Sequence, residues 1–178
     1  MNEAFIYDSI RSPRGKNKNG SLSQITPVDL LSKLMLALEK KYQLDTSLIN
    51  DVIIGCVMPV NDQGANIGKI AAQYSGWDVD IPSMQINRCC GSGIEAVNLA
   101  AMKIRSGWED LIVSGGIECM SRVPIGTDGG PMAFETKVAS RTNYVPQGIG
   151  ADLIATIEGF TRRDLDASVS YTHLRAHE

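Results

Sequence analysis

The first 118 residues predict an α/β fold with a mixed sheet covered by helices. Short apolar runs of strand length alternate with segments whose apolar residues recur at helical spacing, which is typical of a sheet packed under helices. With 178 residues, 43% of them hydrophobic, the chain is long enough to bury one sizeable core. Four runs are expected to be strands: residues 4–9, 51–57, 83–87 and 110–116.

Three helices are expected between these runs. The first covers residues 26–42, with Thr26 as its N-cap and Pro27 in its first turn. The second and third cover residues 65–74 and 93–106. The third is apolar on more than one face, which predicts a helix buried at the centre of the fold.

The pattern changes after residue 118. Residues 119–147 mix proline, glycine, asparagine and serine with scattered methionine, which we interpret as an irregular insertion over the core. Helical periodicity returns at residues 152–157, and Thr161 with Asp164 three residues later is typical of a helix start.

Charge and composition exclude several classes of function. The net charge of −3 provides no basic field for a nucleic acid or an anionic membrane. No apolar run reaches the length of a membrane span, and the N-terminus lacks the pattern of a signal peptide. We therefore expect a cytoplasmic protein that binds neither nucleic acid nor membrane.

The four cysteines lack the paired spacing of a zinc site and the density of a disulfide scaffold, so we expect reduced thiols and no metal. Cys56 lies in an apolar run and is expected to be a small buried core residue. Cys119 is interpreted in the same way. Cys89 and Cys90 remain as candidates for chemistry.

Residues 87–93 place this cysteine pair where an extended run becomes a helix. A helix start gathers unpaired N–H groups and the positive end of the helix dipole, which favour a thiolate and can hold an oxyanion. Adjacent side chains at a strand end point in different directions, and we favour Cys90 because the glycine and serine that open the helix follow it. The structural alternative for Cys90 is a buried helix-start cysteine. Ser92 is interpreted as a hydrogen-bonding residue of the helix start, and Arg88 as the partner of a nearby carboxylate.

Three stretches carry a resemblance to a known family. Residues 87–93 read Asn-Arg-Cys-Cys-Gly-Ser-Gly, residues 114–121 read Ser-Gly-Gly-Ile-Glu-Cys-Met-Ser, and residues 147–152 read Gln-Gly-Ile-Gly-Ala-Asp. Together they resemble the thiolase family, the acetyl-CoA acyltransferases that make or cleave 3-ketoacyl-CoA. The resemblance runs in collinear order over about the first 167 residues, as in the N-terminal portion of a thiolase.

The resemblance implies a function and a domain organisation. Cys90 would be the nucleophile that accepts an acyl group from acyl-CoA, with CoA and acyl-CoA as substrates and no permanently bound cofactor. Fatty acid metabolism is the implied context, and full-length members are dimers or tetramers. Residues 1–118 would be an incomplete N-terminal α/β core and residues 119–167 part of the loop domain. Residues 168–178 do not resemble the family and are interpreted as a non-native tail.

The sequence also departs from the family. Thiolases carry a histidine in a Gly-His-Pro setting, an asparagine in an Asn-Glu-Ala-Phe setting and a second cysteine in a Cys-x-Gly setting, all in the C-terminal half. Residues 2–5 spell Asn-Glu-Ala-Phe at the wrong end of the chain, and the other two motifs do not occur. The only histidines, His173 and His177, fall in the predicted tail. We therefore expect a truncated thiolase without turnover.

Two alternatives stay open at this point. One is a ketoacyl synthase of the same superfamily, although the Gly-Gly-Ile-Glu-Cys-Met-Ser string argues against it. The other is a thiolase-like module that binds CoA or lipid without chemistry. Acyl-chain length and the direction of the reaction are not determined by the sequence.

Overall fold

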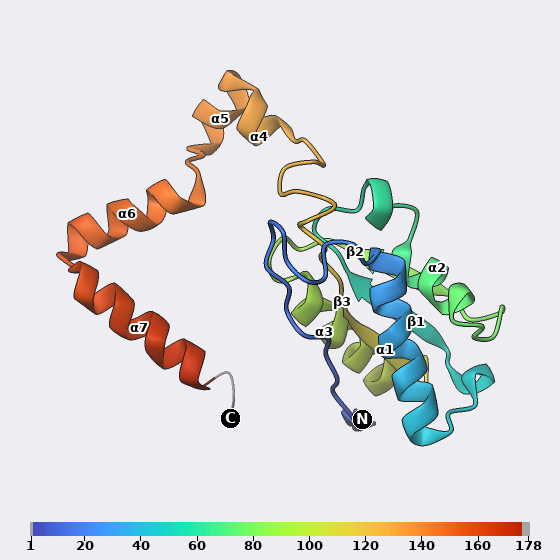
Figure 1. The fold of residues 1–178 in the computed structure, drawn as a ribbon. Coiled ribbons are helices and arrows are strands. Elements are labelled where there is room, and N and C mark those ends of the chain that lie inside the picture. The colour runs from blue at the N-terminus through green and yellow to red at the C-terminus, as the bar shows by residue number, and fades with distance from the viewer. Residues whose placement is uncertain (1, 176–178) are drawn as a thin grey trace. The chain divides into compact units, whose positions relative to one another are not determined.

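The computed structural model describes residues 2–175, which form two compact units. The first unit ends at Asp128 and contains a small sheet with helices on both faces, whereas the second begins at Gly129 and is helical (Figure 1). The sheet and helices of the first unit confirm the predicted α/β class.

The sheet has three parallel strands in the order β2-β1-β3. The central strand β1 (Asp51–Gly55) pairs with β2 (Ser83–Ile86) on one side and with β3 (Ile112–Gly116) on the other. All five residues of β1 are buried, as expected of an apolar strand that is covered on both faces.

The described strands are all parallel, so the expectation of a mixed sheet was wrong. Each connection between successive strands contains a helix, and such a crossover returns the chain in the same direction. The predicted strand at residues 4–9 does not form. Phe5, Ile6 and Tyr7 are all exposed there. A short apolar run becomes a strand only when it pairs with a neighbouring strand, and this segment has no such pairing among the described residues.

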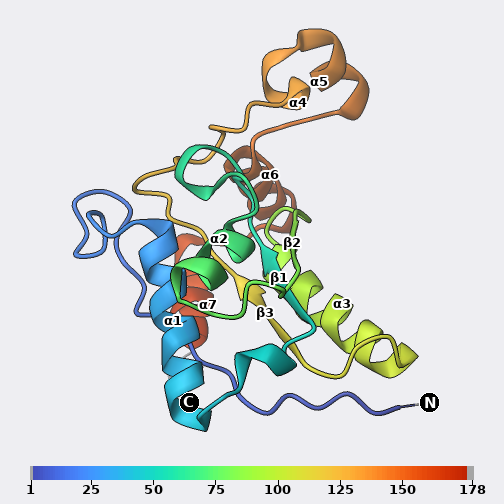
Figure 2. The same ribbon diagram turned by 90° about the vertical axis from the view of Figure 1, so that its right-hand side faces the viewer.

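Helices cover the two faces of the sheet. Helices α1 (Pro27–Tyr42) and α2 (Ile67–Tyr74) pack on one face, and α3 (Ser92–Ser106) packs on the other (Figures 1 and 2). The predicted start of α1 is confirmed, since the backbone N–H of Asp29 donates to Thr26 Oγ1 over 3.1 Å.

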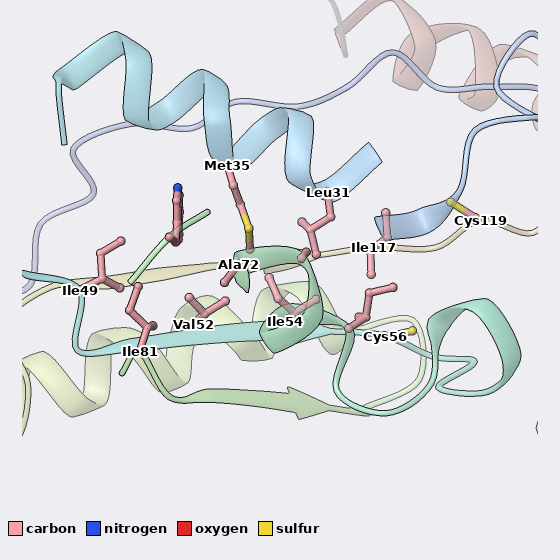
Figure 3. Close-up of a cluster of buried hydrophobic side chains, with 13 residues drawn as sticks. Leu31, Met35, Ile49, Val52, Ile54, Cys56, Ala72, Ile81, Ile117 and Cys119 are labelled. Atoms are coloured by element: carbon pink, nitrogen blue, oxygen red, sulfur yellow. The ribbon is translucent and has the colours of Figure 1, made fainter. Parts of the chain in front are cut away.

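The side chains of β1 alternate between the two faces. Val52 and Ile54 join the larger apolar cluster, in which Leu31 and Met35 of α1 point toward β1 (Figure 3). Ile53 faces the other way, into the smaller cluster beneath α3. The sheet therefore separates two apolar clusters and contributes side chains to both.

Helix α3 is buried on one face only, which corrects the expectation of a helix buried on several. Ala96 and Ala100 lie against the sheet, whereas Ile94 is 72% exposed and Met102 is 56% exposed. A sheet covers a single side of a helix, so the other apolar positions stay exposed in the structure.

The second unit contains four helices among its described residues: α4 (Pro131–Phe134), α5 (Thr136–Thr142), α6 (Gln147–Glu158) and α7 (Arg162–Arg175). Two of them, α4 and α5, lie in the stretch expected to be irregular. The predicted start of α7 is confirmed, since the N–H of Thr161 donates to Asp164 Oδ2 over 2.8 Å. The boundaries at residues 118 and 167, and the non-native tail, remain predictions.

Within residues 2–175, no helix combines the length and the hydropathy needed to cross a lipid bilayer.

Candidate functional site

The candidate site lies at the carboxyl ends of the parallel strands. The helix that follows β1 packs on one face of the sheet, and the helix that follows β2 packs on the other. Where neighbouring strands lead to opposite faces, the loops diverge and leave a crevice that ligands commonly occupy. Cys90 lies in the loop after β2, at this point of divergence.

Both cysteines of the pair are exposed, and Cys90 directly precedes Gly91, the N-cap of α3. Cys89 has a φ of +47°, in the left-handed region, which costs a non-glycine residue about 1–2 kcal/mol. Three hydrogen bonds hold it there: its N–H donates to Asn87 Oδ1 over 2.9 Å, and its carbonyl accepts from Ser92 Oγ over 2.6 Å and from the N–H of Ser92 over 3.0 Å. The turn that presents Cys90 is thus fixed by its neighbours.

Ser92 is a structural residue of this turn, as predicted. Its side chain is buried, donates to the carbonyl of Cys89 and accepts from the N–H of Arg88 over 2.9 Å. With both its donor and an acceptor position used, the hydroxyl is not presented as a nucleophile.

The interpretation of Arg88 is also confirmed. Its Nη2 lies 3.0 Å from Glu95 Oε1 on α3. The guanidinium is 70% exposed, so this ion pair contributes little to stability.

Glycines let the start of α3 lie directly against the sheet. A Cβ added at Gly55, the last residue of β1, would lie 2.4 Å from the carbonyl carbon of Ser92. A Cβ added at Gly116, the last residue of β3, would lie 3.4 Å from Gly93 Cα. The absence of a side chain at Gly55 therefore allows the start of α3, which follows the Cys90 turn, to lie against the sheet.

The other two cysteines are buried, as predicted. Burial, with the nearby Glu118 carboxylate acting in the same direction, raises the pKa of the Cys56 thiol to about 11. Burial likewise raises the pKa of Cys119. Both thiols are held in the unreactive protonated form, which leaves the exposed pair for chemistry.

Sequence reasoning missed one part of the site, a buried polar group formed by Gln63 and Glu118. The Gln63 side chain is fully buried, and its Nε2 donates to Glu118 Oε1 over 2.7 Å and to the carbonyl of Met58 over 2.9 Å. Its Oε1 accepts from the N–H of Cys119 over 2.5 Å. Glu118 belongs to the Gly-Gly-Ile-Glu string noted in the sequence, but nothing in the sequence pairs it with a glutamine 55 positions earlier.

The unit that holds Cys90 contains no histidine, because His173 and His177 come after Asp128 in the sequence. His173 belongs to α7 of the second unit, and His177 lies outside the described residues. Among the described residues, no three or more His, Cys, Asp or Glu side chains are grouped as a metal site would require.

A family model described as "Thiolase, N-terminal domain" matches residues 4–178. The chain belongs to the thiolase family. A 3-ketoacyl-CoA thiolase of Shewanella loihica is 37% identical over 180 aligned positions, which cover 99% of this chain. A 3-ketoacyl-CoA thiolase of Shewanella denitrificans is 36% identical over the same length.

This thiolase-family chain spans 46% of the length of these curated relatives. Among solved structures, the acetyl-CoA acetyltransferase of Bacillus anthracis is similar, with a TM-score of 0.54 and 32% sequence identity. The superposition covers 58% of this chain and 26% of that one. The fold and the sequence thus agree on the N-terminal domain of a thiolase.

Proposed function

We propose that this chain carries the acyl-accepting half of a thiolase reaction, with Cys90 as the nucleophile. The observation that supports the proposal is the position of Cys90, an exposed thiol at the start of α3 and at the carboxyl end of a parallel sheet. The proposed substrates are CoA and acyl-CoA, the class to which the names of the relatives refer.

In the proposed step, the Cys90 thiolate attacks the thioester carbonyl of an acyl-CoA. The carbonyl π electrons move to oxygen, and the N–H groups and dipole at the helix start stabilise that oxyanion. The oxyanion then collapses, the bond to the CoA sulfur breaks, and CoA leaves as a thiolate that takes up a proton. The product is an S-acyl cysteine, which keeps the acyl group activated for a second transfer.

The second transfer returns the acyl group to CoA or joins it to the carbanion of acetyl-CoA, and it requires a base. The first unit holds no histidine that could serve. We therefore propose that the 178 residues by themselves accept an acyl group but do not turn over. No permanently bound cofactor has a role in this step, and the proposed compartment is the cytoplasm.

The experiment is to incubate the purified chain with isotopically labelled acetyl-CoA and to map the adduct by peptide mass spectrometry. The expected result is one acetyl group on Cys90, released by added CoA only in trace amounts. Cys90→Ser should abolish the adduct, and the matched variant Cys89→Ser should retain it.

Other outcomes separate the alternatives. Bound CoA without an adduct would favour the non-catalytic binding module. An adduct on Cys89 that survives in Cys90→Ser would overturn the assignment of the nucleophile. Sustained thiolysis of acetoacetyl-CoA by the isolated chain would overturn the proposal that it lacks turnover.

A further inference from the structure

Glu118 is the partly buried end of a series of hydrogen bonds that leads to the cysteine pair. Its two carboxylate oxygens accept from different groups: Oε1 from the Gln63 amide, and Oε2 from the backbone N–H of Val57 over 2.8 Å. Gln63 is itself held by Met58 and Cys119, so the carboxylate is fixed from the interior of the unit.

The series continues through the loop after β1. The carbonyl of Val57 accepts from Asn87 Nδ2 over 3.0 Å, and Asn87 Oδ1 accepts from the N–H of Cys89 over 2.9 Å. Cys89 holds its left-handed conformation at this bond, one residue before Cys90. Three hydrogen bonds thus connect the partly buried Glu118 carboxylate to the peptide unit beside the exposed thiol.

The two ends of the series differ in their surroundings. Glu118 is partly buried and packed beside the fully buried Gln63, whereas Asn87 and the cysteines are exposed. Hydrogen bonds within residues 87–92 hold the exposed turn locally, and the bonds through Val57 add a restraint from the interior of the unit. The carboxylate does not bond to either cysteine, so its effect on Cys90 is indirect.

We propose that Glu118 is a positioning residue for Cys90, acting through Val57, Asn87 and Cys89. The inference deepens the acyl-accepting role proposed above and rests on it. In this role the carboxylate fixes the turn so that the thiol faces the carbonyl carbon of the substrate while the N–H groups of the helix start face its oxygen.

The test uses Glu118→Gln in the full chain. The amide has nearly the volume of the carboxylate, but its NH₂ group must meet one of the two donors, Gln63 Nε2 or the N–H of Val57, so one of the two hydrogen bonds that fix Glu118 is lost. Glu95→Gln is the matched control, because Glu95 lies beside the same turn, pairs with the exposed Arg88 and is not one of the residues of the series.

The first readout is hydrogen exchange of the Cys89 backbone amide, measured by NMR. We expect exchange to accelerate about tenfold in Glu118→Gln, the effect of one weakened hydrogen bond, and to stay at the wild-type rate in Glu95→Gln. If the exchange rate of the Cys89 amide is unchanged in Glu118→Gln, Glu118 does not restrain the turn through this series, whatever the function of the protein.

The second readout is the rate at which acetyl-CoA acetylates Cys90, compared with its alkylation by iodoacetamide. Acetylation should fall about tenfold in Glu118→Gln, since it needs thiol and oxyanion donors aligned, whereas alkylation needs only an accessible thiolate and should change less than about threefold. If Cys90 is acetylated in the wild type and its acetylation rate is the same in Glu118→Gln, the positioning role is overturned.

Asn87→Ala breaks the series at its exposed end. We expect the same fall in acetylation as in Glu118→Gln, and no further fall in the double variant, because both remove one connected restraint. If the fall in acetylation rate in the double variant equals the product of the two single falls, Glu118 and Asn87 do not act through one series. A wild-type chain that is never acetylated, with accelerated Cys89 exchange in Glu118→Gln, would refute the proposed function and leave the series standing.

Discussion

Substitution of Gly55 by alanine tests the contact that places the Cys90 turn. The added Cβ would lie 2.4 Å from the carbonyl carbon of Ser92 and 2.5 Å from its oxygen, where ordinary contacts begin at 3.4 Å. Moving from 2.4 to 3.4 Å requires α3 and β1 to separate by about 1 Å, and both neighbours are backbone that cannot rotate away. Overpacking of this kind costs about 1–3 kcal/mol, and we expect about 3 kcal/mol because neither side can yield.

The assay is urea unfolding followed by the fluorescence of Trp77, which is buried in the larger cluster of the first unit. With a denaturant slope of about 1–3 kcal/mol per molar urea, the midpoint should fall by more than about 1 M. Acetylation of Cys90 should slow as well, since the turn moves with the start of α3.

Gly93→Ala is the matched control, two residues beyond the N-cap of the same helix. A Cβ at Gly93 meets no atom within 4 Å, so alanine should be neutral or stabilising by up to about 1 kcal/mol through its higher helix propensity. A Gly55→Ala variant within about 0.5 kcal/mol of wild type would show that α3 does not lie against β1 as described.

Two other properties are open to measurement. A small thiol reagent should label the exposed cysteines at least about 100-fold faster than Cys56, because a pKa raised from 9.0 to about 11 lowers its thiolate fraction by that factor; equal labelling of Cys56 and the exposed pair in a peptide map would contradict its burial. Lys103→Met should destabilise the first unit by about 3 kcal/mol, because the ammonium bridges two mostly buried carboxylates. Lys41→Met is the control and should leave the stability nearly unchanged, because the Lys41 ion pair is exposed to solvent. Burial lowers the pKa of Lys103, but hydrogen bonds to Asp51 and Glu109 raise it more, to a net value above 10.5. The contribution of Lys103 to stability is therefore present below pH 10.5 and lost at higher pH. If the urea midpoints of the wild type and Lys103→Met keep their full difference well above pH 10.5, the link between this ion pair and stability is refuted.

Features set by neighbouring residues could be predicted from the sequence. The N-cap at Thr26 and the reciprocal bonds of Thr161 and Asp164 involve residues within one helical turn, and both formed as expected. The strand at residues 4–9 failed for the opposite reason. An apolar run carries no information about whether a partner strand lies beside it.

The candidate site shows the same division. Cys90 at a strand-to-helix turn follows from local pattern, and so does the structural use of Ser92. The pairing of Gln63 with Glu118 joins residues 55 positions apart, and no local signal indicates it. Likewise, the pattern of α3 shows that it is apolar but not which of its faces the sheet covers.

The sequence by itself determined the α/β class, the main helices, the family and the candidate nucleophile, because periodicity, caps and collinear motifs are properties of the chain order. The tertiary structure alone decided that the described strands are parallel, that the start of α3 lies against Gly55, and that Glu118 accepts hydrogen bonds from Gln63 and Val57. These properties depend on contacts between distant segments, and such contacts exist only once the sheet has assembled.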